Sequence, residues 1–183
     1  MIQMYGIAET FGIKAPGHLM IEGYGDGSHP RIPVRKDYVF RREPLRDVLA
    51  FLGNAEGDAL YVTGPTGSGK TSLIMQVAAR LNWPVHAVTC HGRMELTDLI
   101  GQFTLVEGTM SFVHGPLAQA LKEGHILILN ETDLMDPSEL AGLNDCLEGQ
   151  PLVIPQNGGE VIVPHPRFRL VATGNSAGSG DQS

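Results

Sequence analysis

The residues with the clearest chemical signature form one short run with the pattern G-x-x-x-x-G-K-[ST]. The run consists of Gly64, Pro65, Thr66, Gly67, Ser68, Gly69, Lys70 and Thr71. Glycines let backbone N–H groups turn inward without Cβ clashes, so such a loop forms a concave nest for a phosphate. We expect Lys70 to bridge the β- and γ-phosphates and Thr71 to place its hydroxyl on Mg²⁺. The run therefore predicts a nucleoside triphosphate site that uses Mg²⁺.

A carboxylate follows the most apolar stretch of the chain, Ile126-Leu-Ile-Leu-Asn130-Glu131. Such a stretch is typical of a strand buried on both faces. Glu131 then lies just beyond the strand, where it can polarise the water that attacks the γ-phosphate. Asn130 stands where an acid is usual: its amide oxygen can accept from a magnesium-bound water but adds no negative charge. Weaker Mg²⁺ affinity and compensation by Asp133 both stay open.

A second polar side chain, Asn175, follows the apolar segment 168–173 and Gly174. Ligands of parallel α/β sheets bind outside the carboxyl ends of the strands. We therefore expect Asn175 to sense the γ-phosphate and to help hold the attacking water.

Alternating strands and helices must position these residues. The hydrophobic periods and capping residues predict strands over 58–63, 85–89, 125–130 and 168–173, and helices over 44–53, 70–81, 116–123 and 136–149. Two hairpins are predicted, 103–113 turning at Gly108 and 152–163 turning through 157–159. This order indicates an α/β fold with a parallel core sheet covered on both faces.

The N-terminal segment, residues 1–36, shows no sustained period. The chain contains 23 glycines and 12 prolines, and many of them lie in this segment. We interpret it as a loosely structured arm that precedes a nucleotide-binding core over residues 37–183.

Composition excludes several classes of protein. The net charge is −7, and residues 58–183 carry all of it, which argues against bulk electrostatic binding of nucleic acid. Two cysteines are too few for a disulfide framework. No stretch reaches the roughly 18 apolar residues of a membrane span, and no signal pattern opens the chain. We expect a cytoplasmic protein without membrane contact.

Taken together, the motifs resemble the AAA+ ATPases, in particular their MoxR-like branch. The phosphate loop, Asn130-Glu131 in the Walker B place and Asn175 in the sensor-1 place occur in the family's order. The two hairpins resemble the helix-2 insert and the hairpin before sensor 1 in that branch. Residues 37–183 also resemble the ATPase subunits of aerobic cobaltochelatases, in wording such as Asp37-Tyr-Val-Phe40 and Pro164-His-Pro-Arg-Phe-Arg169.

The resemblance implies a three-layer αβα sandwich that binds ATP and Mg²⁺, with the adenine against Tyr38 and Val39. It implies a ring, usually a hexamer, and a partner that carries a von Willebrand A-type domain. It also implies that ATP hydrolysis drives remodelling of a partner protein, with metal insertion as one example. The family continues with an arginine finger and a helical lid, so the chain is expected to be truncated before both.

Three functions fit the sequence. The first is an Mg²⁺-dependent ATPase core in which Glu131, Lys70 and Asn175 are catalytic and Thr71 and Asn130 serve the metal. The second is a nucleotide-gated scaffold that binds ATP but turns it over poorly, as the amide at position 130 and the missing finger suggest. The third is a small-metabolite kinase, which the acid directly after the buried strand and the lack of a basic lid disfavour.

Overall fold

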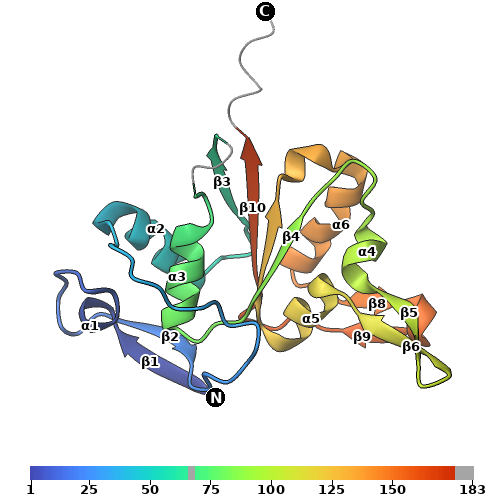
Figure 1. Ribbon diagram of the computed structural model, residues 1–183, viewed down its shortest axis with the longest axis horizontal. Coiled ribbons are helices and arrows are strands. Elements are labelled where there is room, and N and C mark those ends of the chain that lie inside the picture. The colour runs from blue at the N-terminus through green and yellow to red at the C-terminus, as the bar shows by residue number, and fades with distance from the viewer. Residues whose placement is uncertain (66–68, 176–183) are drawn as a thin grey trace, which may run out of the picture. The chain divides into compact units, whose positions relative to one another are not determined.

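The computed structural model of the protein describes residues 1–65 and 69–175 of the 183-residue chain (Figure 1). The chain forms two compact units. The first comprises Met1–Glu56 and Thr66–Val85, and the second comprises Gly57–Pro65 and His86–Ser183.

A small antiparallel sheet and three helices make up the first unit. Its elements are β1 (Ile2–Gly6), α1 (Ile7–Phe11), β2 (Met20–Tyr24), α2 (Arg42–Gly53) and α3 (Ser72–Arg80). The expected apolar face of α2 is confirmed, because Leu45, Val48, Leu49 and Leu52 are all buried.

The expectation of a loosely structured arm over residues 1–36 is wrong for its first part. β1 and β2 pair in antiparallel register, and the Tyr24 amide donates to the Leu81 carbonyl at 2.8 Å. Gly23 permits this close approach, since a Cβ there would lie 2.6 Å from the Leu81 oxygen. β1 and β2 lie far from α3 in the sequence, so no local hydrophobic period predicts that they contact its end. The proposed boundary at residue 37 stays a prediction.

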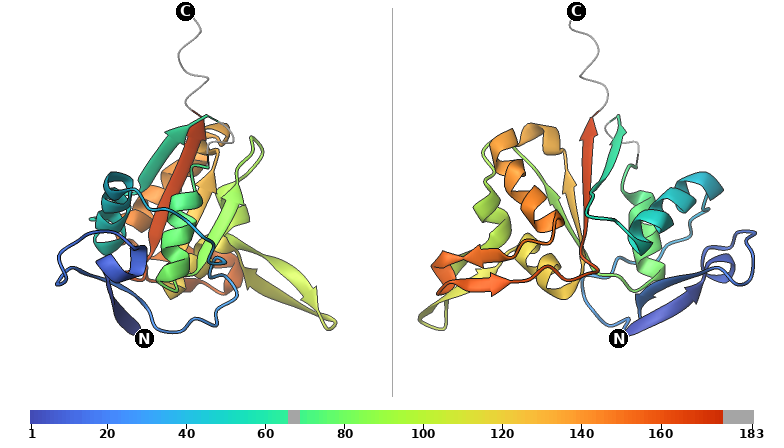
Figure 2. Two further views of the ribbon diagram at one scale, coloured as in Figure 1. Left: turned by 60° about the vertical axis from the view of Figure 1, so that its left-hand side comes forward. Right: turned by 180° about the vertical axis from the view of Figure 1, so that it is seen from behind.

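The second unit is built on a parallel sheet of four strands in the order β3-β10-β7-β4 (Figures 1 and 2). These strands are β3 (Leu60–Gly64), β10 (Arg169–Asn175), β7 (Ile126–Asn130) and β4 (Val85–Thr89). The other elements are α4 (Leu96–Ile100), β5 (Gly101–Val106), β6 (Thr109–His114), α5 (Pro116–Glu123), η1 (Thr132–Leu134), α6 (Pro137–Leu147), β8 (Leu152–Ile154), η2 (Pro155–Asn157) and β9 (Glu160–Ile162).

One hydrophobic core joins the sheet to the helices of this unit. Leu127, Leu129 and Leu170 belong to it together with the buried face of α5, including Leu117 and Leu121. The intervening β7 residues are also fully buried, so the strand is covered on both faces as expected. The predicted α/β class with a parallel core sheet is confirmed.

Capping residues determine where the helices α5 and α6 begin and end. Asp136 caps α6 by accepting a hydrogen bond from the Ser138 amide at 2.9 Å, and Pro137 occupies the first helical position. α5 ends at Gly124, which adopts φ +77° and donates to the Ala120 carbonyl. These helices therefore begin and end within two residues of their predicted bounds.

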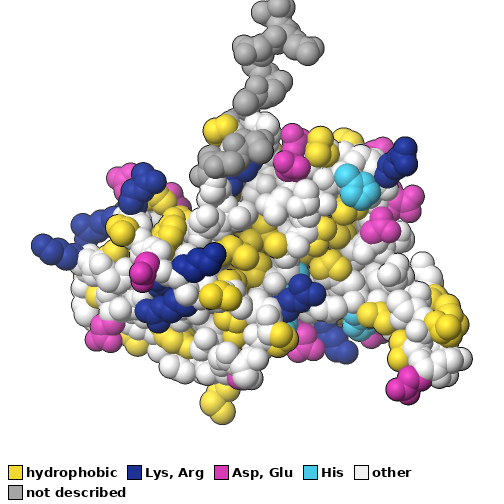
Figure 3. Space-filling model, viewed as in Figure 1, with side chains coloured by type: hydrophobic (Ala, Val, Ile, Leu, Met, Phe, Trp, Pro, Cys, Tyr) yellow, Lys and Arg dark blue, Asp and Glu magenta, His cyan; other side chains and the backbone are white. Residues whose placement is uncertain are grey.

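Both predicted hairpins are present. β5 and β6 pair antiparallel around a two-residue turn in which Glu107 (φ +50°) and Gly108 (φ +80°) both have positive φ. β8 and β9 form the second pair. The β5–β6 hairpin exposes hydrophobic side chains (Figure 3). The five-residue helix α4, which precedes β5, was not predicted because it is too short to show a period.

No helix in the described ranges combines the length and the apolarity that crossing a bilayer requires.

Replacing Leu121 by alanine should destabilise the second unit. Its side chain is fully buried in the core, so the truncation leaves a cavity and should cost about 2–5 kcal/mol of unfolding free energy. Urea denaturation followed by circular dichroism measures this loss. The control is Val153→Ala on β8, where the side chain is 54% exposed and the expected change is within about 0.5 kcal/mol. Equal losses in the two variants would contradict the assignment of the core.

Candidate nucleotide-binding site

The phosphate loop leaves the sheet at the end of β3. Gly64, the last residue of β3, lies opposite Asn175, the last residue of β10, in the parallel register. Thr66, Gly67 and Ser68 lie outside the described residues. Gly69 adopts φ +71°, a conformation that disfavours other residues, so glycine is needed at that point of the loop.

The loop leads directly into α3. Thr71 is the N-cap of α3, and its carbonyl accepts a hydrogen bond from the Met75 amide at 2.9 Å. The Thr71 side chain makes no capping hydrogen bond, so its hydroxyl is not used within the helix. Lys70 is half-buried immediately before it. The first amides of α3, together with the positive end of its dipole, form the kind of terminus that binds anions.

A cavity of about 540 Å³ lies in the first unit beside the first turns of α3. Tyr38 and Thr71 both line it, together with Met75 and Gln76. The structure thus brings two of the predicted binding residues to one cavity. Val39 does not line it and is 88% exposed. Contact between the adenine and these residues stays a prediction.

Two residues that the sequence did not single out fix the wall of this cavity. The buried Gln76 side chain accepts from the Lys36 amide at 2.9 Å and donates to the Val34 carbonyl at 3.3 Å. Arg80 donates to Gln76 Oε1 at 2.9 Å and to the Lys36 carbonyl at 3.0 Å. These bonds tie the segment before Tyr38 to α3. The only signal in the sequence was a Gln–Arg pair at i, i+4, which is common on helices.

The ring of Phe40 adds an apolar contact to the same wall. Its centroid lies 4.9 Å from that of Tyr38, and the Arg80 guanidinium carbon lies 4.8 Å above the Phe40 ring. Burial lowers the pKa of Arg80, with the nearby charge of Arg35 as the second cause. Tyr38 therefore packs against Phe40 and also lines the cavity.

At the carboxyl ends of β7 and β10, one hydroxyl contacts two of the predicted site residues. Thr173 Oγ1 donates to Asn130 Oδ1 and accepts from the Glu131 amide, each at 3.2 Å. The Thr132 hydroxyl donates to the Thr173 carbonyl at 3.2 Å. Thr173 is 1% exposed, so these bonds are shielded from water. The sequence predicts Thr173 only as a strand residue, so this role is apparent only in the structure.

Glu131 has an unusual backbone. Its φ of +59° and ψ of +47° place it in the left-handed region, which costs a non-glycine residue about 1–2 kcal/mol. The Thr173 hydroxyl holds its amide in that conformation. Residues with such conformations concentrate at functional sites, where surrounding contacts compensate the strain.

Burial, with help from nearby carboxylates, raises the pKa of the Cys90 thiol. The Cys90 amide donates to the Asn130 carbonyl at 2.8 Å, and its side chain is buried. Burial is the first cause that raises the pKa of the Cys90 thiol, followed by the charges of Glu131 and Asp133. Asp133 itself is exposed on η1. Both carboxylates therefore act on the end of β4.

The two residues that the sequence predicts for Mg²⁺, Thr71 and Asn130, offer neutral oxygens. Thr71 offers its uncapped hydroxyl, and Asn130 offers an amide oxygen that already accepts one hydrogen bond. Among residues 1–65 and 69–175, no three His, Cys, Asp or Glu side chains form a metal cluster. This chemistry fits Mg²⁺, which keeps several waters and takes most of its ligands from substrate phosphates. Thr71 belongs to the first unit and Asn130 to the second.

Comparison with known proteins places the chain among related sequences. Residues 59–183 match the family described as AAA domain (dynein-related subfamily). The chain is 34% identical over 179 residues to the aerobic cobaltochelatase subunit CobS of a Sinorhizobium species, covering 96% of this chain and 53% of that protein. It is 33% identical over 130 residues to the uncharacterized protein YojN of Bacillus subtilis, covering 69% and 43%. The chain thus spans about half the length of these relatives.

A solved structure shares the fold. A putative ATPase from Cytophaga hutchinsonii superposes with a TM-score of 0.59 at 17% identity, covering 75% of this chain and 40% of that one.

Replacing Thr173 by valine should destabilise the carboxyl ends of β7 and β10. The variant keeps the shape of the side chain but removes both hydroxyl hydrogen bonds, which should cost about 1–3 kcal/mol of unfolding free energy. Urea denaturation at pH 7 measures the loss. Thr109→Val, at an exposed position of β6, is the matched control and should change stability by less than about 0.5 kcal/mol. A neutral Thr173→Val variant would show that the two bonds contribute nothing.

Proposed function

Because the chain belongs to the AAA domain (dynein-related subfamily) family, we propose that it binds ATP with Mg²⁺ and hydrolyses it. This membership confirms the resemblance to AAA+ ATPases of the MoxR-like branch that the motifs indicated. The observation that carries the proposal is the Thr173 hydroxyl. From β10 it fixes both Asn130 and Glu131 at the carboxyl end of β7, the adjacent parallel strand. Ligands of α/β sheets bind at such ends.

Each predicted residue has a separate task in the proposed reaction. Lys70 and the loop amides bind the β- and γ-phosphates. The Glu131 carboxylate takes a proton from the water that attacks the γ-phosphorus. The bond between that phosphorus and the β–γ bridging oxygen breaks, and ADP and inorganic phosphate leave. Asn175 contacts the γ-phosphate and orients the water, a role that its register beside Gly64 supports.

Mg²⁺, when bound, neutralises the charge of the phosphate oxygens. Thr71 would contribute its hydroxyl to the ion, and Asn130 would accept a hydrogen bond from one of the ion's waters. The adenine would occupy the cavity lined by Tyr38, whose wall Gln76 and Arg80 hold in place.

At the level of the assembly, we propose a ring, a hexamer in the family's usual form, in which hydrolysis drives remodelling of a partner protein. Similarity to CobS over 96% of the chain supports a partner with a von Willebrand A-type domain and a metal-insertion complex as one setting.

A second function, a nucleotide-gated scaffold with little hydrolysis, is favoured by Asn130. Its side chain brings no negative charge to the metal, and its oxygen already accepts from Thr173. Both facts weaken the interaction that Asn130 makes with hydrated Mg²⁺. The two functions share ATP binding and differ only in turnover.

Replacing Glu131 by glutamine should separate binding from hydrolysis. The amide keeps the shape of the side chain but cannot take a proton, and a general base contributes about 10²–10⁴-fold to a rate. We expect phosphate release to fall by at least about a hundredfold, with ATP affinity by calorimetry unchanged. Glu148→Gln, at the exposed end of α6, makes the same charge change and should leave both quantities unaltered. If wild type hydrolyses ATP no faster than Glu131→Gln, Glu131 is not the base.

Replacing Asn130 by aspartate should distinguish the ATPase from the scaffold. The added charge should lower the Mg²⁺ concentration needed for half-maximal hydrolysis, because a carboxylate accepts from the ion's waters more strongly than an amide does. Phosphate release titrated with MgCl₂ measures this concentration. ATP binding with negligible hydrolysis in both wild type and Asn130→Asp would support the scaffold instead.

A further inference from the structure

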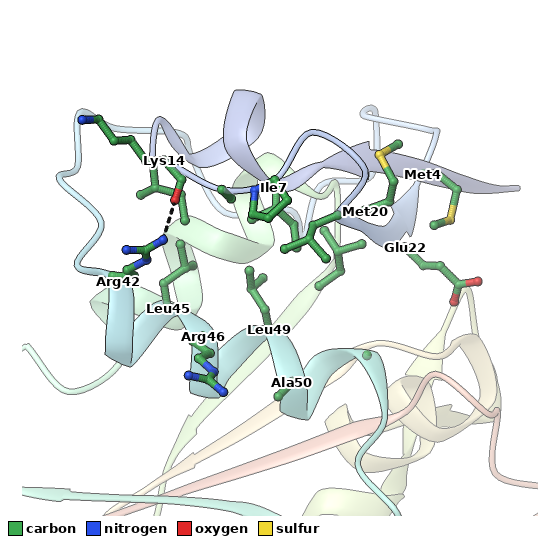
Figure 4. Close-up of a pocket in the computed structure, with 16 residues that line it drawn as sticks. Met4, Ile7, Lys14, Met20, Glu22, Arg42, Leu45, Arg46, Leu49 and Ala50 are labelled. Carbon is green, nitrogen blue, oxygen red and sulfur yellow. Dashed lines mark hydrogen bonds between the residues drawn. The ribbon is translucent and has the colours of Figure 1, made fainter.

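A second cavity, larger than the one beside α3, lies in the first unit away from the phosphate loop. It has a volume of about 680 Å³ and runs between α2 and the segment that carries β1, α1 and β2 (Figure 4). Its floor includes the buried side chains Leu45, Leu49 and Ile21. None of the residues proposed for ATP binding or hydrolysis lines it. It therefore needs a separate explanation.

The groove is held in shape by a bond within the unit. The Arg42 guanidinium donates to the Lys14 carbonyl at 3.1 Å, as the dashed line in Figure 4 shows. This bond ties the turn after α1 to the first turn of α2. Because the floor is buried core and the walls are tied together, the groove exists without an occupant.

One wall has the dimensions and spacing of a helix-packing surface. The exposed residues Arg42, Arg46, Ala50 and Gly53 line the groove at the i, i+4, i+8 and i+11 positions of α2, which lie along one face of the helix. α2 has 12 residues, so this wall is about 18 Å long. At its far end, a Cβ added to Gly53 would meet nothing within 4 Å, which leaves room for side chains of an occupant.

The opposite wall includes exposed side chains from one face of the small sheet. Met4 lies opposite Glu22 in the register of β1 and β2, and Met20 is two residues from Glu22, so all three share one face. Met4 is 49% and Met20 is 47% exposed. Methionine side chains adapt to the shape of a partner, so this part of the wall can receive the apolar face of a helix.

Charge distinguishes the two ends of the groove. Lys14, Arg42 and Arg46 line it near the start of α2, whereas Glu22 is the only acid that lines it. Basic side chains gather over this part of the first unit in Figure 3. Arg46 makes no ion pair or hydrogen bond within the described part of the chain. The cations therefore complement a negatively charged segment.

We propose that this groove binds an amphipathic helix of a partner protein, with an apolar stripe against Ala50 and the two methionines and with acidic residues at the end that lies beside Arg42 and Arg46. A concave groove with an acid on its rim favours such a helix over the flat surface of an anionic membrane. Helix binding in this groove does not depend on ATP binding or hydrolysis, so the groove proposal and the proposed ATPase function can fail independently.

A synthetic acidic peptide tests the proposal. The probe is an acetylated and amidated amphipathic peptide of about 16 residues, long enough to form a helix in water, with leucines at i, i+3, i+4 and i+7 and glutamates at one end. Its matched control carries lysine in place of every glutamate. Methyl NMR of the seven methionines should show shifts at Met4 and Met20 with the acidic peptide and none at Met110, which is exposed on β6.

Charge reversal in the groove gives the second arm. The variant Arg46→Glu should weaken the acidic peptide about fivefold or more in fluorescence anisotropy, because an attraction becomes a repulsion while the Arg42–Lys14 bond is kept. The control, Arg31→Glu, makes the same change at an exposed position of the same unit that does not line the groove. It should bind the peptide as wild type does. Circular dichroism checks that both variants are folded.

Four results would overturn the proposal. The first is an absence of shifts at Met4 and Met20 with the acidic peptide, and the second is equal affinity for the lysine peptide. In the third, vesicles of anionic phospholipid shift the two methionines and the peptide does not, which assigns the groove to lipid. In the fourth, the shifts depend on protein concentration without peptide, which assigns it to a second copy of the chain.

Discussion

The candidate site depends on the position of β10 between β3 and β7. β10 is the last of the four core strands in the chain, yet it pairs in parallel with both of these earlier strands. Parallel strands end at one edge of the sheet, so Gly64, Asn130 and Asn175 come from three distant segments to the same edge. The start of the phosphate loop, the Walker B position and the sensor position thus share one scaffold of backbone hydrogen bonds.

At that edge, the neutral and buried hydroxyl of Thr173 orients two neighbouring residues without a charged side chain. Thr173 uses its single proton on Asn130 and a lone pair on the Glu131 amide, so one side chain orients two neighbours. The left-handed backbone of Glu131 stays in place because its amide is held in this way. The arrangement therefore orients both residues without a charged side chain.

In the first unit too, hydrogen bonds from side chains hold distant segments of the chain together. Gln76 and Arg80 project from α3 and bind the backbone of residues 34–36, a segment with no regular structure of its own. The β1–β2 sheet is bound in turn to the end of α3 through the Leu81 carbonyl. Side chains and carbonyls of one helix therefore position both the cavity beside Tyr38 and the sheet that walls the larger groove.

The sequence by itself determined the features that are encoded locally. The phosphate loop, the buried strand before Glu131, the cap at Asp136 and the turn at Gly108 each depend on residues within a few positions of one another. Hydrophobic period, capping and turn geometry therefore predicted most helices, the core strands and both hairpins. The class of fold followed from them.

Only the tertiary structure decided the contacts between distant segments. Thr173 lies more than 40 positions from Asn130, and Gln76 lies 40 from Lys36, so their hydrogen bonds depend on strand register and helix placement. The same holds for Gly23, whose use is apparent only where Leu81 approaches it. A side chain's residue type limits which bonds it makes, but its neighbours in space decide which of them form.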